Sequence, residues 1–371
     1  MQNLLTPETR GAYLAEIQAD YQKAREQHAN KKGVALLTIN EARKNKLQLS
    51  FTGEFAPVKP KFIGRRVFKN IDLSLIAQYI DWAPFFQTWD LAGSYPAILS
   101  DKIVGEAATK VFAEAQNMLK KIIDGRWLTA NGVIALMPAN TVNDDDIEIY
   151  TDDTRTQVAF TYYGMRQQSV KPVINGVARP NQCLSDFIAP KASVTDAKID
   201  DYIGLFAVTG GLGIEKIAAR FDAANDDYSG IMFKALADRF AEAFAEYMHE
   251  RVRTDFWGYA ANEDLREKSG IEALIKEQYQ GIRPAPGYPA CPDHTVKPDI
   301  FNLLQCEEIG MSLTESFAML PAAAVSGLYF AHPQAKYFSV DKIGVDQLED
   351  MAKRRDLPKE YLERWLSPNL N

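Results

Sequence analysis

Three short runs of strand-forming residues constrain the fold of this chain more than any other feature. Residues 132–137, 146–150 and 157–163 are rich in β-branched and aromatic side chains, and clusters of Asp and Asn separate them. Connections this short make neighbouring strands antiparallel, because a parallel crossover needs about a dozen residues or more. A fourth run at residues 201–208 follows a proline-containing loop rather than a helix. The pattern therefore predicts an antiparallel meander and not a βαβ series.

Helical periodicity accounts for much of the remaining chain. Apolar residues three and four apart predict an amphipathic helix over residues 102–124, with Gly125 as its C-cap. Similar patterns predict helices over the ranges 72–82, 226–253, 263–278, 301–309 and 341–357, and strands over 313–319, 325–330 and 336–340. Residues 362–365 are expected to close the domain. We expect residues 34–60 to be irregular. The chain is predicted to have an α+β fold in one domain, residues 34–371, preceded by a polar helical linker in residues 1–33.

Composition excludes several classes of protein. The chain is 46% hydrophobic and 25% charged, which is ordinary for a soluble globular protein. Its net charge of −7 argues against a nucleic-acid binder, and no apolar run reaches membrane-spanning length. The cysteines, Cys183, Cys291 and Cys306, include no C-x-x-C pair and suggest neither a disulfide framework nor a zinc site. We therefore predict a cytoplasmic protein that binds neither nucleic acid nor membrane.

Residues 281–294 form a proline-rich stretch that cannot be a helix interior or a central strand. Proline has no N–H to donate and biases the preceding residue to extended conformations, and four prolines occur here: Pro284, Pro286, Pro289 and Pro292. Such a stiff loop loses little entropy when it binds a ligand. Arg283 adds a planar guanidinium suited to a carboxylate or phosphate, and we expect the N–H groups of Gly287 and Tyr288 to be free. The alternative is a surface connection with no ligand.

Other candidate binding residues lie outside this loop. Asp81 stands among aromatic residues and is either a helix cap or a carboxylate in a pocket. Glu242 falls opposite the apolar side of the helix over 226–253, a face that by default meets solvent, and His249 is expected on that same solvent side. Tyr337 and Phe338 would point to opposite faces of a strand, so that one lines a cleft or both belong to the core.

Together these side chains suit a zwitterionic, partly aromatic ligand. A guanidinium meets a carboxylate, an acid meets an ammonium, and aromatic faces attract a sulfonium or stack on a base. S-adenosylmethionine has all of these groups. The histidines form no metal-binding pattern and no nucleophile stands beside a base, so we predict neither a metal site nor a catalytic residue.

Four motifs carry a resemblance to a known family. Residues 281–294 (GIRPAPGYPACPDH), 81–86 (DWAPFF), 241–251 (AEAFAEYMHER) and 314–319 (TESFAM) strongly resemble the C-terminal activation domain of cobalamin-dependent methionine synthase. The resemblance runs over essentially the whole chain, and the first thirty or so residues resemble the linker that follows the cobalamin-binding domain.

The resemblance implies a single C-shaped α+β domain, built on a long twisted antiparallel sheet, that binds S-adenosylmethionine in a shallow cleft. Its task would be reactivation, in which one electron from a flavodoxin-type reductant and the methyl group of S-adenosylmethionine convert cob(II)alamin to methylcobalamin. The cobalamin would belong to a partner domain. By motif match the ligand site would contain Asp81, Glu242, Arg283, Ala285, Gly287, Tyr288 and Tyr337. Phe338 stands where relatives have a second tyrosine, so only a backbone contact is expected there.

Motifs of the other methionine synthase functions are missing from this chain. It has no D-x-H-x-x-G cobalamin motif, no cysteine cluster for zinc and no folate barrel, so we expect a methyltransferase domain that does not make methionine alone. We expect either a piece of a longer enzyme or a stand-alone reactivator. Two alternatives stay open: an independent S-adenosylmethionine-dependent methyltransferase that uses the glycine-rich residues 209–215, and a docking module without a ligand.

Overall fold

A long antiparallel sheet forms the centre of the protein. The computed structural model describes residues 6–29, 35–174, 176–192 and 198–371. The main sheet has strand order β10-β7-β2-β3-β4, and β1 pairs with β2 on the same edge as β3. These strands are β1 (Gly64–Ile71), β2 (Thr129–Val142), β3 (Asp146–Tyr150), β4 (Val158–Tyr163), β7 (Asp201–Leu212) and β10 (Ala324–Tyr329). Every pairing in it is antiparallel, as predicted, and β2, β3 and β4 form a meander. The fourth predicted strand, β7, does not continue that meander, because it pairs with β2 and not with β4.

The two central strands are buried on both faces because they separate two hydrophobic cores. In β2, Val133 and Ala135 face one core, and the alternate residues Ile134 and Leu136 face the other. The register places Ala135 opposite Leu205 of β7, which belongs to the same core. This arrangement explains why these strands read as nearly continuous apolar runs rather than alternating ones.

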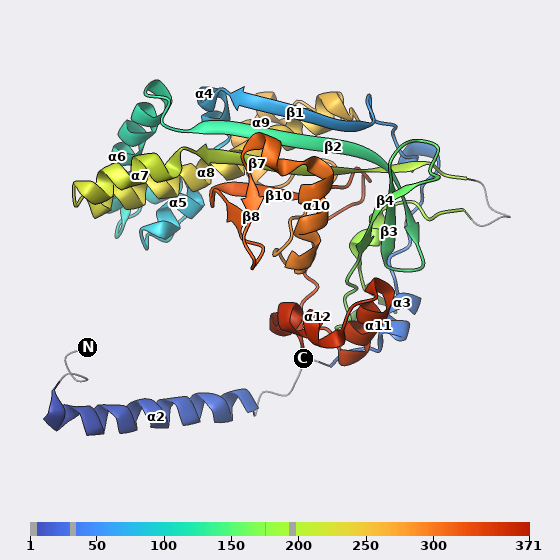
Figure 1. The fold of residues 1–371 in the computed structure, drawn as a ribbon, viewed down its shortest axis with the longest axis horizontal. Helices are drawn as coiled ribbons and strands as arrows, with labels where there is room; N and C mark the ends of the chain where they lie inside the picture. Colours follow the sequence, from blue (N-terminus) through green and yellow to red (C-terminus); the bar gives the residue numbers. More distant parts are fainter. Residues whose placement is uncertain (1–5, 30–34, 175, 193–197) are drawn as a thin grey trace.

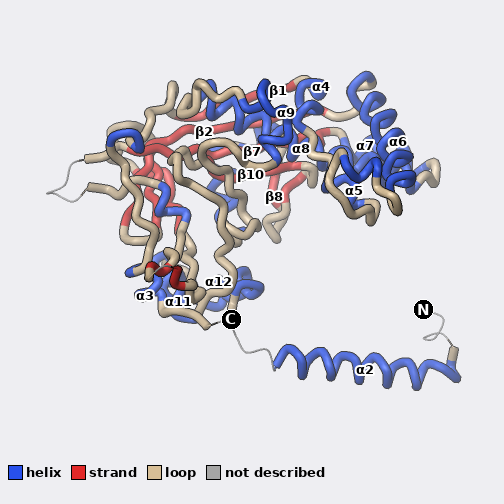
Figure 2. Tube along the Cα trace, turned by 180° about the vertical axis from the view of Figure 1, so that it is seen from behind, coloured by secondary structure: helices blue, strands red, loops and turns tan. Residues whose placement is uncertain are grey.

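Helices cover the sheet and form a second lobe below it. The helices of the described residues are α2 (Pro7–Ala29), which lies apart, and α3 (Ile39–Lys44), α4 (Leu73–Ile76), α5 (Ala83–Thr88), α6 (Gly105–Asp124), α7 (Ile214–Ala223), α8 (Asp227–Arg251), α9 (Leu265–Ile275), α10 (Lys297–Leu304), α11 (Val345–Arg355) and α12 (Lys359–Leu366). In Figures 1 and 2 the long strands span the upper part, and β3 and β4 turn down toward α3, α11 and α12. The predicted C shape and flanking helices are thus present.

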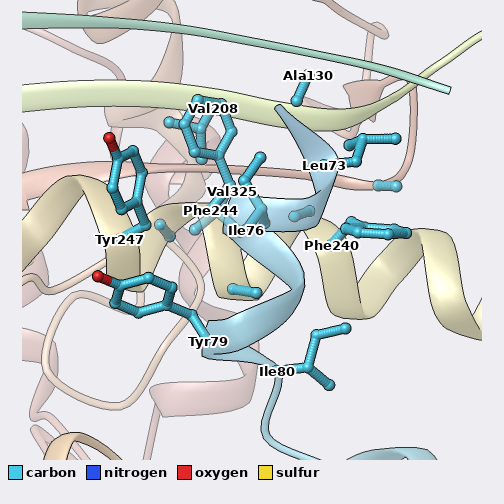
Figure 3. Packing of buried hydrophobic residues seen from close by; sticks show 14 of the residues in the cluster. Leu73, Ile76, Tyr79, Ile80, Ala130, Val208, Phe240, Phe244, Tyr247 and Val325 are labelled. Carbon is cyan, nitrogen blue, oxygen red and sulfur yellow. The ribbon is translucent and has the colours of Figure 1, made fainter. Parts of the chain in front are cut away.

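Helix α8 anchors the elements around the site. Its residues Phe240, Phe244 and Tyr247 pack beneath the sheet, as the helical pattern predicts. Figure 3 shows α4 and the 3₁₀ turn Ala77–Tyr79 lying against this helix. The rings of Tyr79 and Tyr247 meet edge to face with centroids 5.4 Å apart. This packing fixes the segment that carries Asp81 beside α8.

Several sequence predictions are wrong in detail. Residues 34–60 are not wholly irregular, because Thr38 forms a capping box with Glu41 and begins α3. Strand β1 was not predicted. The range 313–319 is a tight hairpin between β8 (Ser312–Leu313) and β9 (Met319–Leu320), and another small hairpin joins β5 (Val173–Ile174) to β6 (Val177–Ala178).

Residues 336–340 do not form the predicted strand either. The N–H of Val340 donates to the carbonyl of Pro289 at 2.9 Å, and that proline has no N–H to return a bond. The segment is therefore held by isolated hydrogen bonds and not by the regular backbone hydrogen bonds of a β-strand.

Helix α2 lies apart from the sheet in Figure 1. The last residues of the predicted linker, 30–33, lie outside the described residues. Across the part of the chain that is described, none of the helices combines the length and apolar character needed to cross a membrane. Cys183, Cys291 and Cys306 are buried free thiols.

Candidate functional site

The proline-rich loop is attached to the exposed edge of β10. Ile282 and Phe330 exchange two backbone hydrogen bonds of 3.0 Å, and the N–H of Leu328 donates to the carbonyl of Pro284 at 2.9 Å. Because Pro284 only needs to accept here, it is compatible with a position beside an edge strand. The loop thus extends the sheet without being one of its strands, as its proline content requires.

A tight turn at Gly287 shapes the tip of the loop. Pro286 and Gly287 occupy its central positions, Gly287 has φ of +99°, and the N–H of Tyr288 donates to the carbonyl of Ala285 at 3.1 Å. The N–H of Gly287 donates to the carbonyl of Cys291 at 2.8 Å. The expectation of free N–H groups at Gly287 and Tyr288 is therefore wrong, because the turn itself uses both donors.

Tyr288 lies over the α8 residue Glu242. Its hydroxyl donates to Glu242 Oε1 at 3.0 Å, although the side chain is 52% exposed. Partial burial, together with the neighbouring Glu242 carboxylate, raises the pKa of Tyr288 to about 12. The face of α8 that by default meets solvent is thus covered by the loop, which is the condition for Glu242 to act in a site.

Arg283 is held from two directions. Its backbone N–H donates to the Tyr337 hydroxyl at 2.9 Å, and its Nη2 donates to Glu246 Oε2 at 2.9 Å. Glu246 lies one turn after Glu242 on α8, so both acids project from the same face of the helix. Burial is the largest single influence and by itself would lower the pKa of Arg283, but Glu246 and the other acidic groups around the guanidinium together raise it well above its usual value.

Asp81 combines the two roles proposed for it. Its Oδ1 accepts the N–H of Ala83 at 2.9 Å in the first turn of α5, so it acts as a cap. It also lines the cavity described next.

A cavity of 710 Å³ brings together most of the predicted site residues. Its lining contains the predicted residues Asp81, Glu242, Arg283, Ala285, Tyr288, Tyr337 and Phe338. Gly287 is exposed and lies outside the lining. Tyr337 and Phe338 both line the cavity, whereas the strand prediction would have placed them on opposite faces.

The cavity wall carries more negative than positive groups. Its carboxylates are Asp81, Glu242, Glu246 and Glu277, and its guanidiniums are Arg239 and Arg283. Arg239 pairs with Asp238 outside the cavity, and Arg283 pairs with Glu246. Tyr79, Tyr279 and the apolar face of α9, with Ile271, Leu274 and Ile275, complete the wall. Such a site favours a ligand that bears positive charge next to apolar and aromatic surface.

The sequence reasoning missed Glu246 and misplaced His249. Glu246 stands four residues after Glu242, a spacing that could have revealed it. His249 is fully buried rather than on the solvent side, because its ring stacks on Tyr329 with centroids 5.3 Å apart. Burial, followed by the neighbouring guanidiniums of Arg253 and Arg283, holds the pKa of His249 well below its usual value.

The glycine-rich residues 209–215 take no part in this cavity. Thr209 to Leu212 end β7, and Gly213 begins α7 with φ of +98°. A Cβ on Gly211 would lie 2.7 Å from the Cβ of Ala323, so this glycine allows close packing. Within the described residues, no group of three or more His, Cys, Asp or Glu could hold a metal ion.

Comparisons with known proteins agree with this geometry. The family described as "Vitamin B12 dependent methionine synthase, activation domain" matches residues 72–356. Among solved structures, the chain is similar to that of the MetH reactivation domain bound to AdoHcy. The two share 49% sequence identity with a TM-score of 0.83, and the match covers 91% of this chain and 99% of that one.

Proposed function

Because this chain belongs to the family of activation domains of vitamin B12-dependent methionine synthase, we propose that its cavity binds S-adenosylmethionine and presents the methyl group for reductive methylation of cob(II)alamin. The observation that carries the proposal is that one cavity is lined by Arg283, four carboxylates and four tyrosines, among them Tyr288 and Tyr337. S-adenosylmethionine carries a sulfonium, an ammonium and a carboxylate, and its net positive charge suits a wall with excess carboxylates.

Each part of the ligand has a counterpart in the cavity wall. Arg283 receives the carboxylate, since its guanidinium fork matches that group. Asp81, Glu242 and Glu277 are the carboxylates left for the ammonium once Glu246 is paired with Arg283. Tyr288, Tyr337 and Phe338 supply faces for the sulfonium or the adenine, and Ala285 leaves room beside them. Gly287 contributes by setting the turn, because its N–H is already used.

In this reaction the chain binds and orients S-adenosylmethionine and does not transfer protons. A sulfonium methyl is already activated, so a strong nucleophile held in line suffices without a general base. Cobalamin held by a partner domain would supply that nucleophile after one-electron reduction by a flavodoxin-type donor, and S-adenosylhomocysteine would leave as the methyl group is transferred. The methyltransferase role of this chain is then to fix the sulfonium and to shield it from water.

The proposed division of the chain follows from the same role. Residues 34–371 form the ligand-binding unit, and residues 1–33 connect it to a cobalamin-binding domain. The cytoplasmic location inferred from composition stays a prediction.

Calorimetric titration with S-adenosylmethionine tests the proposal. We expect wild type to bind and Arg283→Ala to lose about 1.5–3 kcal/mol of binding free energy, because a charge-assisted contact to the carboxylate is removed. Arg220→Ala, an exposed position on α7, is the matched control and should bind like wild type. Absence of a binding signal for wild type would favour the docking module without a ligand. Unchanged affinity in Arg283→Ala would contradict the assigned site.

A further inference from the structure

We propose that Glu246 is a positioning residue that holds the Arg283 guanidinium in place for the ligand carboxylate, and that Arg253 and Glu263 hold Glu246 in turn. This inference rests on the proposed function and adds the support behind its key cation. The site residues expected from the sequence do not include Glu246, Arg253 or Glu263.

The first link is the contact between Glu246 and Arg283. Glu246 is 8% exposed and accepts a hydrogen bond of 2.9 Å from Arg283 Nη2. Arg283 extends from a loop, whereas Glu246 projects from the long helix α8. A long arginine side chain has many rotamers, and a fixed acceptor selects one of them. The helix thus sets the direction of a side chain that the loop alone would leave free.

The second link is a buried cation, Arg253, that attracts the Glu246 carboxylate without a direct hydrogen bond. Arg253 Nη1 lies 3.8 Å from Glu246 Oε1, and Arg253 is wholly buried. Arg253 donates three hydrogen bonds to the Glu263 carboxylate, two from Nε at 2.9 and 3.1 Å and one from Nη2 at 2.7 Å. The Tyr279 ring lies over the Arg253 guanidinium, 4.3 Å from centroid to carbon. Charges therefore alternate from Arg283 through Glu246 and Arg253 to Glu263 and sum to zero.

The third observation is a donor left over at the end of this series. Arg283 Nε is buried and has no hydrogen-bond partner within the described structure. Arg253 Nη1 and Glu246 Oε1 are buried without a hydrogen-bond partner in the same way, so the unpaired polar atoms gather around the contact between Arg283 and Glu246. The bond to Glu246 occupies Nη2, and the Arg283 side chain stays 21% exposed beside the cavity that it lines.

The charge of Glu246 by itself works against such a ligand. A carboxylate beside the site repels the ligand carboxylate, so Glu246 favours binding only by orienting Arg283. Two substitutions separate orientation from charge. Glu246→Gln keeps an acceptor oxygen at the same reach and removes the charge, whereas Glu246→Asp keeps the charge and shortens the reach.

The test is titration of the full chain with two compounds. S-adenosylmethionine carries the carboxylate, and 5′-methylthioadenosine keeps the adenosine and sulfur without it. We expect Glu246→Asp to weaken S-adenosylmethionine binding about tenfold, as for loss of a charge-assisted bond, and Glu246→Gln to stay within about threefold of wild type. Binding of 5′-methylthioadenosine should change little in either variant. Glu272→Asp, an exposed acid on α9 paired with Lys276, is the control.

The outcomes separate this inference from the proposed function. Failure of wild type to bind S-adenosylmethionine overturns both. If wild type binds and Arg283→Ala does not, but Glu246→Asp binds like wild type, only the role of Glu246 is overturned. Equal weakening of both compounds, or a greater loss in Glu246→Gln than in Glu246→Asp, also overturns it. If Glu246→Asp does not fold, Glu263→Asp tests the same support one step farther away, with the same selective loss expected.

Discussion

Two acids of the cavity wall are already paired with neighbouring side chains before a ligand binds. Arg283 is paired with Glu246, and Glu242 accepts the hydroxyl of Tyr288. Paired charges cost less to bury than isolated ones, which allows a charged wall to coexist with apolar surface from α9. A ligand therefore adds its groups to an ordered network, and the network limits how many side chains must be reoriented.

His249 makes this network sensitive to acid. Its pKa is well below the ordinary value of 6.5, first because of burial and then because Arg253 and Arg283 are near. The unfolded chain takes up a proton below about pH 6.5 while the folded chain does not, so stability falls as pH falls through that range. Between about pH 7.5 and 5.5, wild type should lose about 1.4 kcal/mol more than His249→Gln.

Chemical denaturation of both proteins across this pH range measures the effect. Since other acids titrate equally in the two proteins, only the difference between their slopes is interpreted. Parallel curves for wild type and His249→Gln would contradict a neutral buried histidine.

At the scale of elements, the site depends on how the proline-rich loop joins an edge strand to a helix. One end pairs with β10 through Ile282, and its tip places Tyr288 over α8. The prolines stiffen the loop, and its backbone hydrogen bonds to β10 anchor it to the sheet. Both are needed, since neither alone would fix the distance between Arg283 and Glu246.

Replacement of Gly287 should damage the loop at its turn. Gly287 has φ of +99°, and an added Cβ would lie 2.3 Å from His294 Cε1. We expect Gly287→Ala to cost about 1–3 kcal/mol of stability and to weaken S-adenosylmethionine binding. Thermal unfolding and titration measure these effects.

Gly11→Ala in α2 serves as the control, because a Cβ there meets no other atom within 4 Å. It should be neutral or slightly stabilising in a helix. An unchanged unfolding midpoint in Gly287→Ala would mean that the turn adapts without strain.

At the scale of the whole molecule, the lower lobe is held by contacts among residues that follow α2 in the chain. The N–H of Leu37 donates to the carbonyl of Gln168 at 2.7 Å, and the N–H of Ile39 donates to Asp346 Oδ2 at 2.6 Å. Arg166 is fully buried and pairs with Asp145 and Asp186. These contacts begin after residue 34, which supports the proposed division of the chain.

Removal of residues 1–34 should therefore leave the folded unit intact. We expect the shortened chain, residues 35–371, to unfold within about 0.5 kcal/mol of the full chain, as is usual for changes away from a core. Its affinity for S-adenosylmethionine should also be unchanged. Both quantities follow from denaturation and titration of the two chains in parallel. A clear loss of either would show that the first helix contributes to the unit.

Sequence periodicity determined the antiparallel sheet, most helices and the exclusion of residues 281–294 from regular structure. These features depend on side chains a few residues apart, which local steric and apolar patterns record. The same patterns, with the family motifs, selected Arg283 and Glu242 as site residues.

Only the tertiary structure decided how those residues are used. It paired Arg283 with Glu246, 37 positions away in the chain, and buried His249 against Tyr329. It also used the N–H groups of Gly287 and Tyr288 for hydrogen bonds within the loop, and it left residues 336–340 outside the β-strands. Hydrogen bonds and burial between distant segments depend on how elements pack, and no local spacing in the sequence encodes which partner will be met.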